Sequence, residues 1–301
     1  CVTAVNGDFW DPAGRPVGAM VAGGELLTTP AIDHAHLTVD GGGRPTLDHG
    51  FDWTVAAATL DGLRVAAGAV NRPVGGDGTS FFTRRWGATT GTPAGTAEVT
   101  LDFLLPSPSA LPAGTTTVRV GPVRTTGSSV IGPNQVVVAG SGAAGADVAA
   151  FAARAASFLG GLGTLTVELG GAQTVLGGSP LLLRDGRPAY PTGNADSFTQ
   201  DRHARTVVGV TATGDLLLVT VDANAASAGM SLAEVTELMT GLGAVSAMNL
   251  DGGGSTTFVT GGQVRNSPPN GERPVASALA LLPQQGDLLA ALLDALLGGA
   301  P

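Results

Sequence analysis

The chain contains no lysine, and all fifteen of its cationic side chains are arginines. With a net charge of -9 and no basic stripe along the sequence, the composition argues against nucleic-acid binding. We attribute the bias toward Arg, Ala, Gly, Val and Pro to a G+C-rich genome and draw no functional conclusion from the missing lysines. In an acidic chain, an arginine inside a motif is informative, because an anionic ligand needs local positive charge.

Cysteine and long apolar runs are also scarce. Cys1 is the single cysteine, which excludes an internal disulfide framework. There is no run of about twenty apolar residues, so we predict no membrane-spanning helix. The chain opens without Met on a strand-like stretch at residues 2–5, and we expect further N-terminal strands and an export signal upstream of it.

The composition of the 301 residues predicts a large core with many turns. Hydrophobic residues make up 43% and charged residues 13%, which argues against global disorder. The 47 glycines and 19 prolines favour short strands joined by turns. No internal repeat or linker divides the chain, so we predict one domain over residues 1–283.

Apolar patterns predict an α+β fold, a large mixed and mostly antiparallel sheet system with two or three packed helices. Residues 205–211 and 216–221 form a predicted hairpin, and residues 185–204 a predicted exposed loop. Further strands are predicted over residues 2–5, 36–39, 54–60, 63–70, 97–105, 116–120, 134–139, 164–169, 180–184, 244–250, 256–260 and 275–282.

Helical spacing appears in three places. Apolar residues from Val148 to Leu159 share one face and predict a helix over residues 146–159. Ser231 and Glu234 have the spacing of a capping box, which predicts a second helix ending at Gly241 or Gly243. A leucine stripe over residues 284–301 predicts a helical tail that either docks on the domain or binds a partner.

The strongest motif is Asn249-Leu250-Asp251-Gly252-Gly253-Gly254-Ser255-Thr256-Thr257. Three glycines after an apolar strand let the backbone approach a ligand closely and aim its amides at an anion. Asp251 is a candidate acid, base or nucleophile, and Ser255 and Thr256 add hydroxyl groups. Alternatively, the run is only a tight turn, and it lacks the lysine of a nucleotide-binding P-loop.

Two other motifs carry weaker signals. Asn6-Gly7-Asp8-Phe9-Trp10 is either a turn with aromatic packing or a polar strand end with an aromatic wall for a sugar. Arg205-Thr206 begins an apolar strand, where the guanidinium suits phosphate oxygens or simply faces solvent. Gly177-Gly178-Ser179-Pro180 taken alone is a plain turn.

The histidines offer two less favoured candidates. Asp33-His34-Ala35-His36 places both rings on one face of a strand, as a metal site requires. No matching acidic or histidine cluster stands out elsewhere, so we predict no metal. His203 lies two residues before Arg205 and is either a proton-transfer group or a loop histidine without a role.

Taken together and in order, these motifs resemble the phosphodiester glycosidase family over most of residues 1–283. Asp8 stands where members often have a second glycine, and Asp222-Ala223 where they often have Asp-Gly. The resemblance rests on Asn6-Gly7-Asp8-Phe9, Asn71-Arg72-Pro73, Gly132-Pro133-Asn134, Gly177-Gly178-Ser179-Pro180-Leu181-Leu182, Arg184-Asp185-Gly186, Ala204-Arg205-Thr206-Val207-Val208-Gly209, Val221-Asp222, Ser231-Leu232-Ala233-Glu234, Asn249 to Ser255 and Arg273-Pro274-Val275-Ala276.

The resemblance implies hydrolysis of a sugar 1-phosphodiester at the anomeric carbon, giving a free sugar and a phosphomonoester. We predict no cofactor. Asp251 is the expected chief carboxylate, with Asp222 and Glu234 as further candidates, although a capping role explains Glu234 better. Arg205 is expected on the phosphate. The other expected substrate-binding residues are Asn6, Asp8, Thr206, Asn249, Gly252, Gly253, Gly254 and Ser255.

We expect the substrate to be a sugar-phosphate glycan or a small glycosyl phosphodiester, and the protein to be secreted or held in a bacterial cell envelope. The alternative is a non-catalytic glycan- or phosphate-binding module at the cell surface. An interaction domain that uses the tail as its contact surface is a third interpretation, but it leaves the clustered motifs unexplained.

Overall fold

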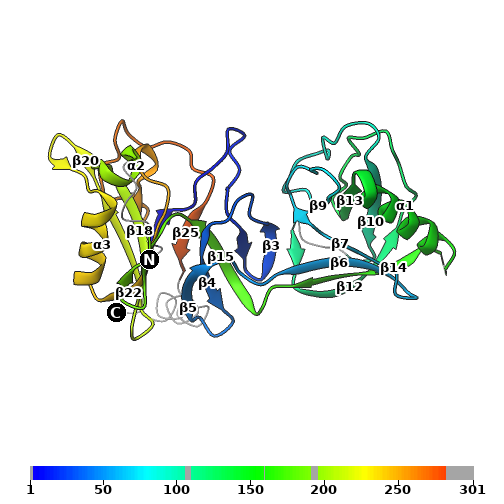
Figure 1. Cartoon of the computed structure of the whole chain (residues 1–301), viewed down its shortest axis with the longest axis horizontal. Helices are drawn as coiled ribbons and strands as arrows, with labels where there is room; N and C mark the ends of the chain where they lie inside the picture. Colours follow the sequence, from blue (N-terminus) through cyan, green and yellow to red (C-terminus); the bar gives the residue numbers. More distant parts are fainter. Residues whose placement is uncertain (1–2, 106–109, 159, 191–195, 283–301) are drawn as a thin grey trace, which may run out of the picture. The chain divides into compact units, whose positions relative to one another are not determined.

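The computed structural model describes residues 3–105, 110–158, 160–190 and 196–282 (Figure 1). The chain divides into two compact units. Unit 1 comprises residues 1–15 and 178–301, and unit 2 comprises residues 16–177. Unit 2 is therefore continuous in sequence and interrupts unit 1 after Arg15.

Unit 2 contains an eight-stranded sheet with the order β7-β6-β14-β12-β10-β13-β9-β8. Neighbouring strands are antiparallel except for the parallel pair β8 and β9. The strands are β6 (Thr54–Thr59), β7 (Arg64–Ala66), β8 (Ala69–Val70), β9 (Thr79–Phe82), β10 (Ala97–Phe103), β12 (Gly114–Val120), β13 (Gln135–Gly140) and β14 (Leu162–Glu168).

A six-stranded sheet completes unit 2, with the order β11-β3-β2-β15-β4-β5. Side chains from both sheets, such as Leu26 and Leu101, join Phe151 in one buried hydrophobic cluster. Burial of this apolar surface is the main stabilising contribution to the unit. The strands are β2 (Met20–Ala22), β3 (Glu25–Thr28), β4 (Ala35–Asp40), β5 (Pro45–His49), β11 (Leu111–Pro112) and β15 (Ala172–Gly178).

Helix α1 (Gly142–Ala156) packs on the eight-stranded sheet (Figure 1). Its buried residues are Val148, Phe151, Ala152 and Ala155, all on the predicted face. The helix begins four residues before the predicted start at Ala146. There the Ala143 amide donates to the Asp77 carboxylate at 3.2 Å, so a distant segment satisfies a free N-terminal amide.

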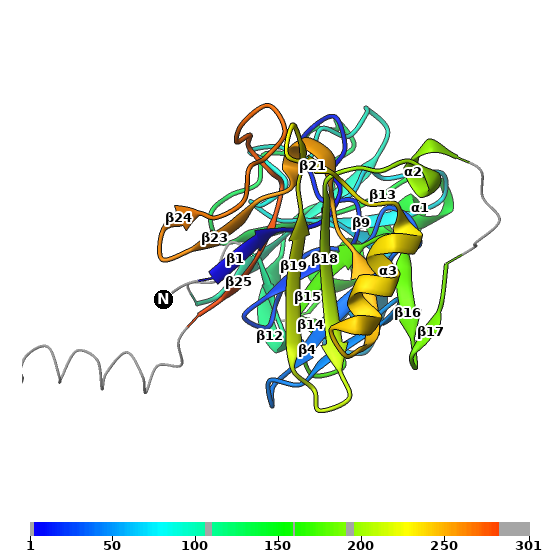
Figure 2. The ribbon, with the colours of Figure 1, turned by 90° about the vertical axis from the view of Figure 1, so that its left-hand side faces the viewer.

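Unit 1 contains a four-stranded sheet, β24-β23-β1-β25, a five-stranded sheet, β17-β16-β22-β18-β19, and the small hairpin β20-β21 (Figure 2). Their bounds are β1 (Thr3–Asn6), β16 (Leu181–Arg184), β17 (Arg187–Pro188), β18 (Arg205–Thr211), β19 (Leu216–Val221), β20 (Ala223–Asn224), β21 (Ser227–Ala228), β22 (Ala244–Asn249), β23 (Phe258–Thr260), β24 (Gln263–Val264) and β25 (Ala278–Leu281).

Helix α3 (Leu232–Gly241) lies on the five-stranded sheet (Figure 2). Val235 and Met239 are fully buried and pack with Leu183 and Val207 of the sheet. The predicted capping box is confirmed, since the Glu234 amide donates to Ser231 Oγ and the Ser231 amide donates to Glu234 Oε2. The helix also ends at Gly241, one of the two predicted positions.

The predicted fold class is confirmed, because the described chain is mostly β, with antiparallel sheets and three α-helices. The predicted strand over 63–70 is wrong. It is two strands, β7 and β8, because the Gly68 amide between them donates to Thr79 Oγ1 at 2.8 Å. The predicted loop over 185–204 contains β17 and the short helix α2 (Ser197–Gln200), whose amides Asp196 caps.

Several strands were missed, including the short strands β2, β3, β5 and β9 and the seven-residue strand β15. The predicted tail helix over residues 284–301 lies outside the described residues, and the domain boundary at 283 stays a prediction. In the described ranges, no helix combines the length and the apolar character that crossing a bilayer requires.

Replacing Phe151 by Ala should destabilise unit 2 by about 3–5 kcal/mol, because it leaves a cavity under α1. Denaturant unfolding followed by the fluorescence of Trp53 and Trp86, in a Trp10→Phe background, measures this loss. Phe158→Ala at the partly exposed end of the same segment is the control. Equal losses in the two variants would contradict the assigned core.

Candidate active site

The site begins where β22 ends and the chain passes into the 3-10 turn η1 (Gly253–Ser255). The Leu250 amide donates to the Thr206 carbonyl at 2.8 Å, and the Asp251 amide donates to the Gly7 carbonyl at 3.0 Å. The glycine loop is thereby fixed between the start of β18 and the end of β1.

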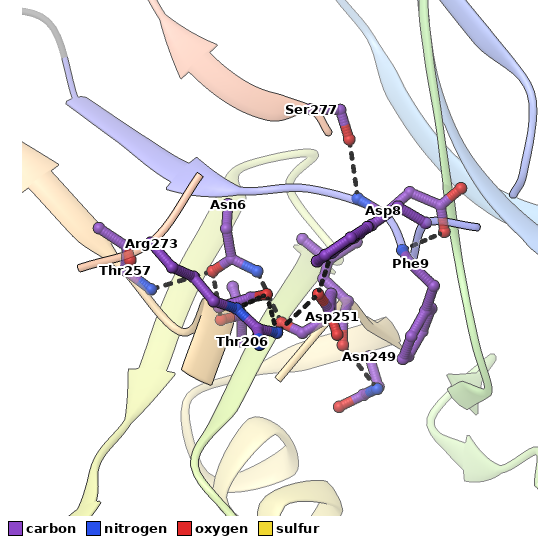
Figure 3. A network of polar contacts seen from close by, with 12 residues as sticks. Asn6, Asp8, Phe9, Thr206, Asn249, Asp251, Thr257, Arg273 and Ser277 are labelled. Carbon is purple, nitrogen blue, oxygen red and sulfur yellow. Dashed lines mark hydrogen bonds and ion pairs between the residues drawn. The ribbon is translucent and has the colours of Figure 1, made fainter. Parts of the chain in front are cut away.

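Asn6 holds this arrangement together (Figure 3). Its Nδ2 donates to the Asp251 carbonyl at 2.6 Å. Its Oδ1 accepts from Thr206 Oγ1 at 2.6 Å and from the Thr257 amide at 3.0 Å. Because Asn6 is buried, these bonds fix the backbone on both sides of the glycine run.

Each glycine of the run meets a different constraint. A Cβ on Gly252 would lie 2.7 Å from the Ala204 carbonyl oxygen, so a side chain there displaces the loop from β18. Gly253 has a φ of +54°, which L side chains rarely adopt. A Cβ on Gly254 would lie 3.3 Å from Arg273 Cζ. The run therefore lets the loop pack closely against its neighbours.

The Asp251 carboxylate is partly exposed and has two polar neighbours. Trp10 Nε1 donates to Asp251 Oδ2 at 3.2 Å, and Arg273 Nη2 lies 3.8 Å from the same oxygen (Figure 3). A carboxylate that solvent can reach is the group that a nucleophile or general base requires.

Asp251 lines a pocket of about 260 Å³. Two aromatic rings form part of its wall, Phe9 and Phe198, with centroids 6.1 Å apart. Apolar walls combined with a few polar groups are typical of small-molecule sites. The pocket residues are Phe9, Phe198, His203, Ala204, Arg205, Asp251, Gly252 and Gly253.

Arg273 lies beside the carboxylate and stacks over the Trp10 ring at 5.6 Å. Its Nε and Nη2 both donate to Ser255 Oγ, at 3.1 and 2.6 Å. Arg273 belongs to one of the motifs that carry the family resemblance, but no role was predicted for it. Contact with a residue eighteen positions away is not visible in local sequence patterns.

The profile of the phosphodiester glycosidase family matches residues 112–282, more than half of the chain. This chain belongs to the phosphodiester glycosidase family. The predicted family resemblance is thus confirmed.

Curated relatives match a shorter stretch. The chain is 40% identical over 77 residues to N-acetylglucosamine-1-phosphodiester alpha-N-acetylglucosaminidase of Bos taurus, and 38% identical over 77 residues to that of Homo sapiens. The stretch is 26% of this chain and 15% of each relative. The chain therefore aligns with less than a sixth of the length of these relatives.

Two crystal structures share the fold. A hypothetical protein from Synechocystis matches with a TM-score of 0.66 and 21% identity, over 92% of this chain and 50% of that one. A protein of Burkholderia pseudomallei, provisionally named as exported, matches with a TM-score of 0.65 and 24% identity, over 93% of this chain and 66% of that one. At these sequence identities, the similarity shows a shared fold only.

The structure separates the predicted family site residues into two groups. Asp251, Arg205, Gly252 and Gly253 line the pocket. The other predicted residues do not line this pocket. They are Asn6, Asp8, Thr206, Asn249, Gly254, Ser255, Asp222 and Glu234. Phe198 also lines the pocket but was missed, because it sits on a four-residue helix that leaves no periodic signal.

Asn249 and Asp8 serve the scaffold around the family loop. Asn249 Nδ2 donates to the carbonyls of Ser179 and Leu250, both at 2.8 Å. Asp8 is buried, and its carboxylate accepts from the Phe9 amide at 2.8 Å (Figure 3). These contacts position Phe9 and the end of β22.

Asp222 supports the same region from the end of β19. Its carboxylate accepts from Asn266 Nδ2 and from the Ser267 amide, both at 2.9 Å. Asn266 in turn donates to the Thr256 carbonyl at 2.9 Å. Asp222 thus holds the segment that follows the glycine loop.

Glu234 is occupied at the start of α3. Its carboxylate pairs with Arg202 and closes the capping box with Ser231. The hydrogen bond from Arg202, and then the backbone bond from Ser231, lower the pKa of Glu234 to about 2.

This lowered pKa predicts how α3 responds to acid. Because the folded-state pKa of Glu234 is depressed, its contribution is fully present above the ordinary value of 4.5 and is lost as the pH falls toward about 2. The difference in Tm between the wild type and Glu234→Gln should shrink over that interval. A difference independent of pH from 2 to 6 would contradict this prediction.

Arg205 holds backbone carbonyls even though it borders the pocket. Its Nε donates to the Met230 carbonyl at 3.0 Å, and its Nη2 to the carbonyls of Phe198 and Asp201 at 2.6 and 3.2 Å. Arg205 is 1% exposed. Burial lowers the pKa of Arg205 to about 10, which leaves it protonated at neutral pH.

Arg205→Lys should therefore destabilise the protein by about 2 kcal/mol or more, although the charge is kept, because an ammonium group cannot replace the planar set of donors. Thermal unfolding of the variant measures the effect. Arg187→Lys, at an exposed position of the same unit, should leave Tm unchanged. An unchanged Tm for Arg205→Lys would show that these carbonyl contacts contribute little.

Of the two histidines that were weighed as metal ligands, His36 lies in β4 of unit 2 and His34 directly precedes this strand. His36 Nε2 accepts from the Ala19 amide at 3.1 Å, and its ring packs beside Phe51. Within the part of the chain that the structure describes, no group of three His, Cys, Asp or Glu side chains gathers as metal ligands. His203, in contrast, lines the pocket, with Nε2 3.1 Å from the Ser197 carbonyl oxygen.

Proposed function

We propose that the chain hydrolyses sugar 1-phosphodiesters at the anomeric carbon and releases a free sugar and a phosphomonoester. The observation that carries this proposal is the Asp251 carboxylate, which lines the pocket at the end of the glycine loop. Membership of a family of glycosidases supports the reaction class.

In the proposed reaction, the sugar occupies the pocket against the rings of Phe9 and Phe198. Asp251 either attacks the anomeric carbon, forming a glycosyl ester that water then hydrolyses to the free sugar, or removes a proton from a water molecule that attacks this carbon directly. The bond from this carbon to the bridging oxygen breaks, and the electron pair leaves with the phosphomonoester. This leaving group is stable as an anion, so the reaction needs little help from a general acid.

We further propose that the substrate is a glycan or small glycosyl phosphodiester outside the cytoplasm of a bacterium, and that the reaction needs no cofactor. The names of the curated relatives, which describe an N-acetylglucosamine 1-phosphodiester as substrate, support a phosphodiester link. Wall polymers, exopolysaccharides and capsules all contain such links.

The first test is Asp251→Asn, assayed by release of free sugar from methyl phosphodiesters of several α- and β-linked sugars. The variant should lose at least about 10³-fold in kcat, because the amide neither attacks carbon nor accepts a proton. Asp222→Asn should mainly lower Tm, because it weakens the bonds to Asn266 and Ser267.

Two other outcomes separate the alternatives. If Asp251→Asn keeps its activity and Asp222→Asn loses it, the reaction class stands but Asp251 is not the reacting group. If the wild type binds the substrates and turns over none of them, the non-catalytic glycan- or phosphate-binding module replaces the proposal.

A further inference from the structure

We propose that Arg273 forms the phosphate subsite of this enzyme, and that Ser255 and Gly254 are the positioning residues that hold its guanidinium there. The inference rests on the proposed function and names a group for the leaving phosphate. It assigns this part of the substrate to Arg273 instead of Arg205.

The first observation is the orientation of the guanidinium. Nε and Nη2 of Arg273 both donate to Ser255 Oγ, at 3.1 and 2.6 Å, and Ser255 is fully buried. One fixed oxygen therefore sets the plane of an otherwise long and flexible side chain. Fixing the donors before substrate arrives reduces the entropy that binding would otherwise cost.

The second observation is the surface on which the guanidinium lies. It is packed between the Trp10 ring, 5.6 Å from Cζ, and the backbone of the glycine loop. A Cβ at position 254 would lie 3.3 Å from Cζ and from Nη1, so a larger residue there would require the guanidinium to shift by a few tenths of an ångström. Glycine at this position therefore fits the observed place of Arg273.

The third observation is access. The Arg273 side chain is 46% exposed, whereas Arg205 is 1% exposed and donates to three backbone carbonyls. A phosphate can therefore reach Arg273 without displacing buried hydrogen bonds, which are costly to lose.

The fourth observation is the distance to the reacting group. Arg273 Nη2 lies 3.8 Å from Asp251 Oδ2, and Asp251 also lines the pocket (Figure 3). A sugar in the pocket with its anomeric carbon at Asp251 places the bridging oxygen next to this cation. Positive charge at that position stabilises the negative charge that develops as the phosphomonoester leaves.

The test compares two leaving groups on the same sugar, a methyl phosphodiester and a neutral 4-nitrophenyl glycoside. Arg273→Gln should lower kcat/KM for the phosphodiester by about 10²-fold, because it removes a donor to the leaving group. It should change kcat/KM for the nitrophenyl glycoside by less than about threefold. Inorganic phosphate should inhibit the wild type competitively and the variant only weakly.

Two further variants complete the test. Arg265→Gln removes one exposed positive charge of the same unit and should leave both substrates unaffected. Ser255→Ala keeps the charge of Arg273 but removes its fixed acceptor, so it should lower kcat/KM for the phosphodiester alone, by about tenfold. Tm of each variant shows whether the protein remains folded.

An equal loss on both substrates in Arg273→Gln would overturn the inference, because Arg273 would then act through Asp251. No turnover of either substrate by the wild type would contradict the proposed function and leave the subsite to be tested by binding. Calorimetric titration with inorganic phosphate then decides: binding by the wild type that Arg273→Gln loses supports the subsite, and no binding by the wild type overturns it.

Discussion

The site depends on one buried amide side chain. Asn6 donates to the Asp251 carbonyl and accepts from the Thr206 hydroxyl and the Thr257 amide. No other residue type of this size offers both a donor and an acceptor in the same plane, and aspartate lacks the donor. Loss of the amide would remove three hydrogen bonds around the glycine run, and only bonds such as those of the Leu250 and Asp251 amides would then hold the loop.

Burial separates the supporting polar groups from those that are proposed to meet substrate. Thr206, Asn249 and Arg205 are almost fully buried. Thr206 donates to the Asn6 side chain, whereas Asn249 and Arg205 donate to backbone carbonyls of the same unit. Asp251 and Arg273 have partly exposed side chains. A family motif therefore combines residues with different tasks. Arg205 and Arg273 have the same chemistry but different partners, because Arg205 donates to three backbone carbonyls and Arg273 donates to the Ser255 hydroxyl.

Local patterns predicted the features that depend on local contacts. The face of α1, the hairpin of β18 and β19 and the capping box of Ser231 and Glu234 all follow from spacing along a few residues. The missed features depend on distant partners. Asp77 extends α1 from outside the helix, and Ser255 orients Arg273 across eighteen positions. Sequence motifs alone placed Asp251 in the predicted site, but they could not distinguish a buried arginine from an exposed one.

Unit 1 is assembled from two segments that the whole of unit 2 separates in the sequence. During translation, residues 16–177 emerge as an unbroken stretch that can fold as a unit. Asn6 emerges early, but its partners Asp251 and Thr257 follow 245 and 251 positions later. The anchor of the site therefore closes only after Thr257 has been synthesised, when all of unit 2 has already emerged.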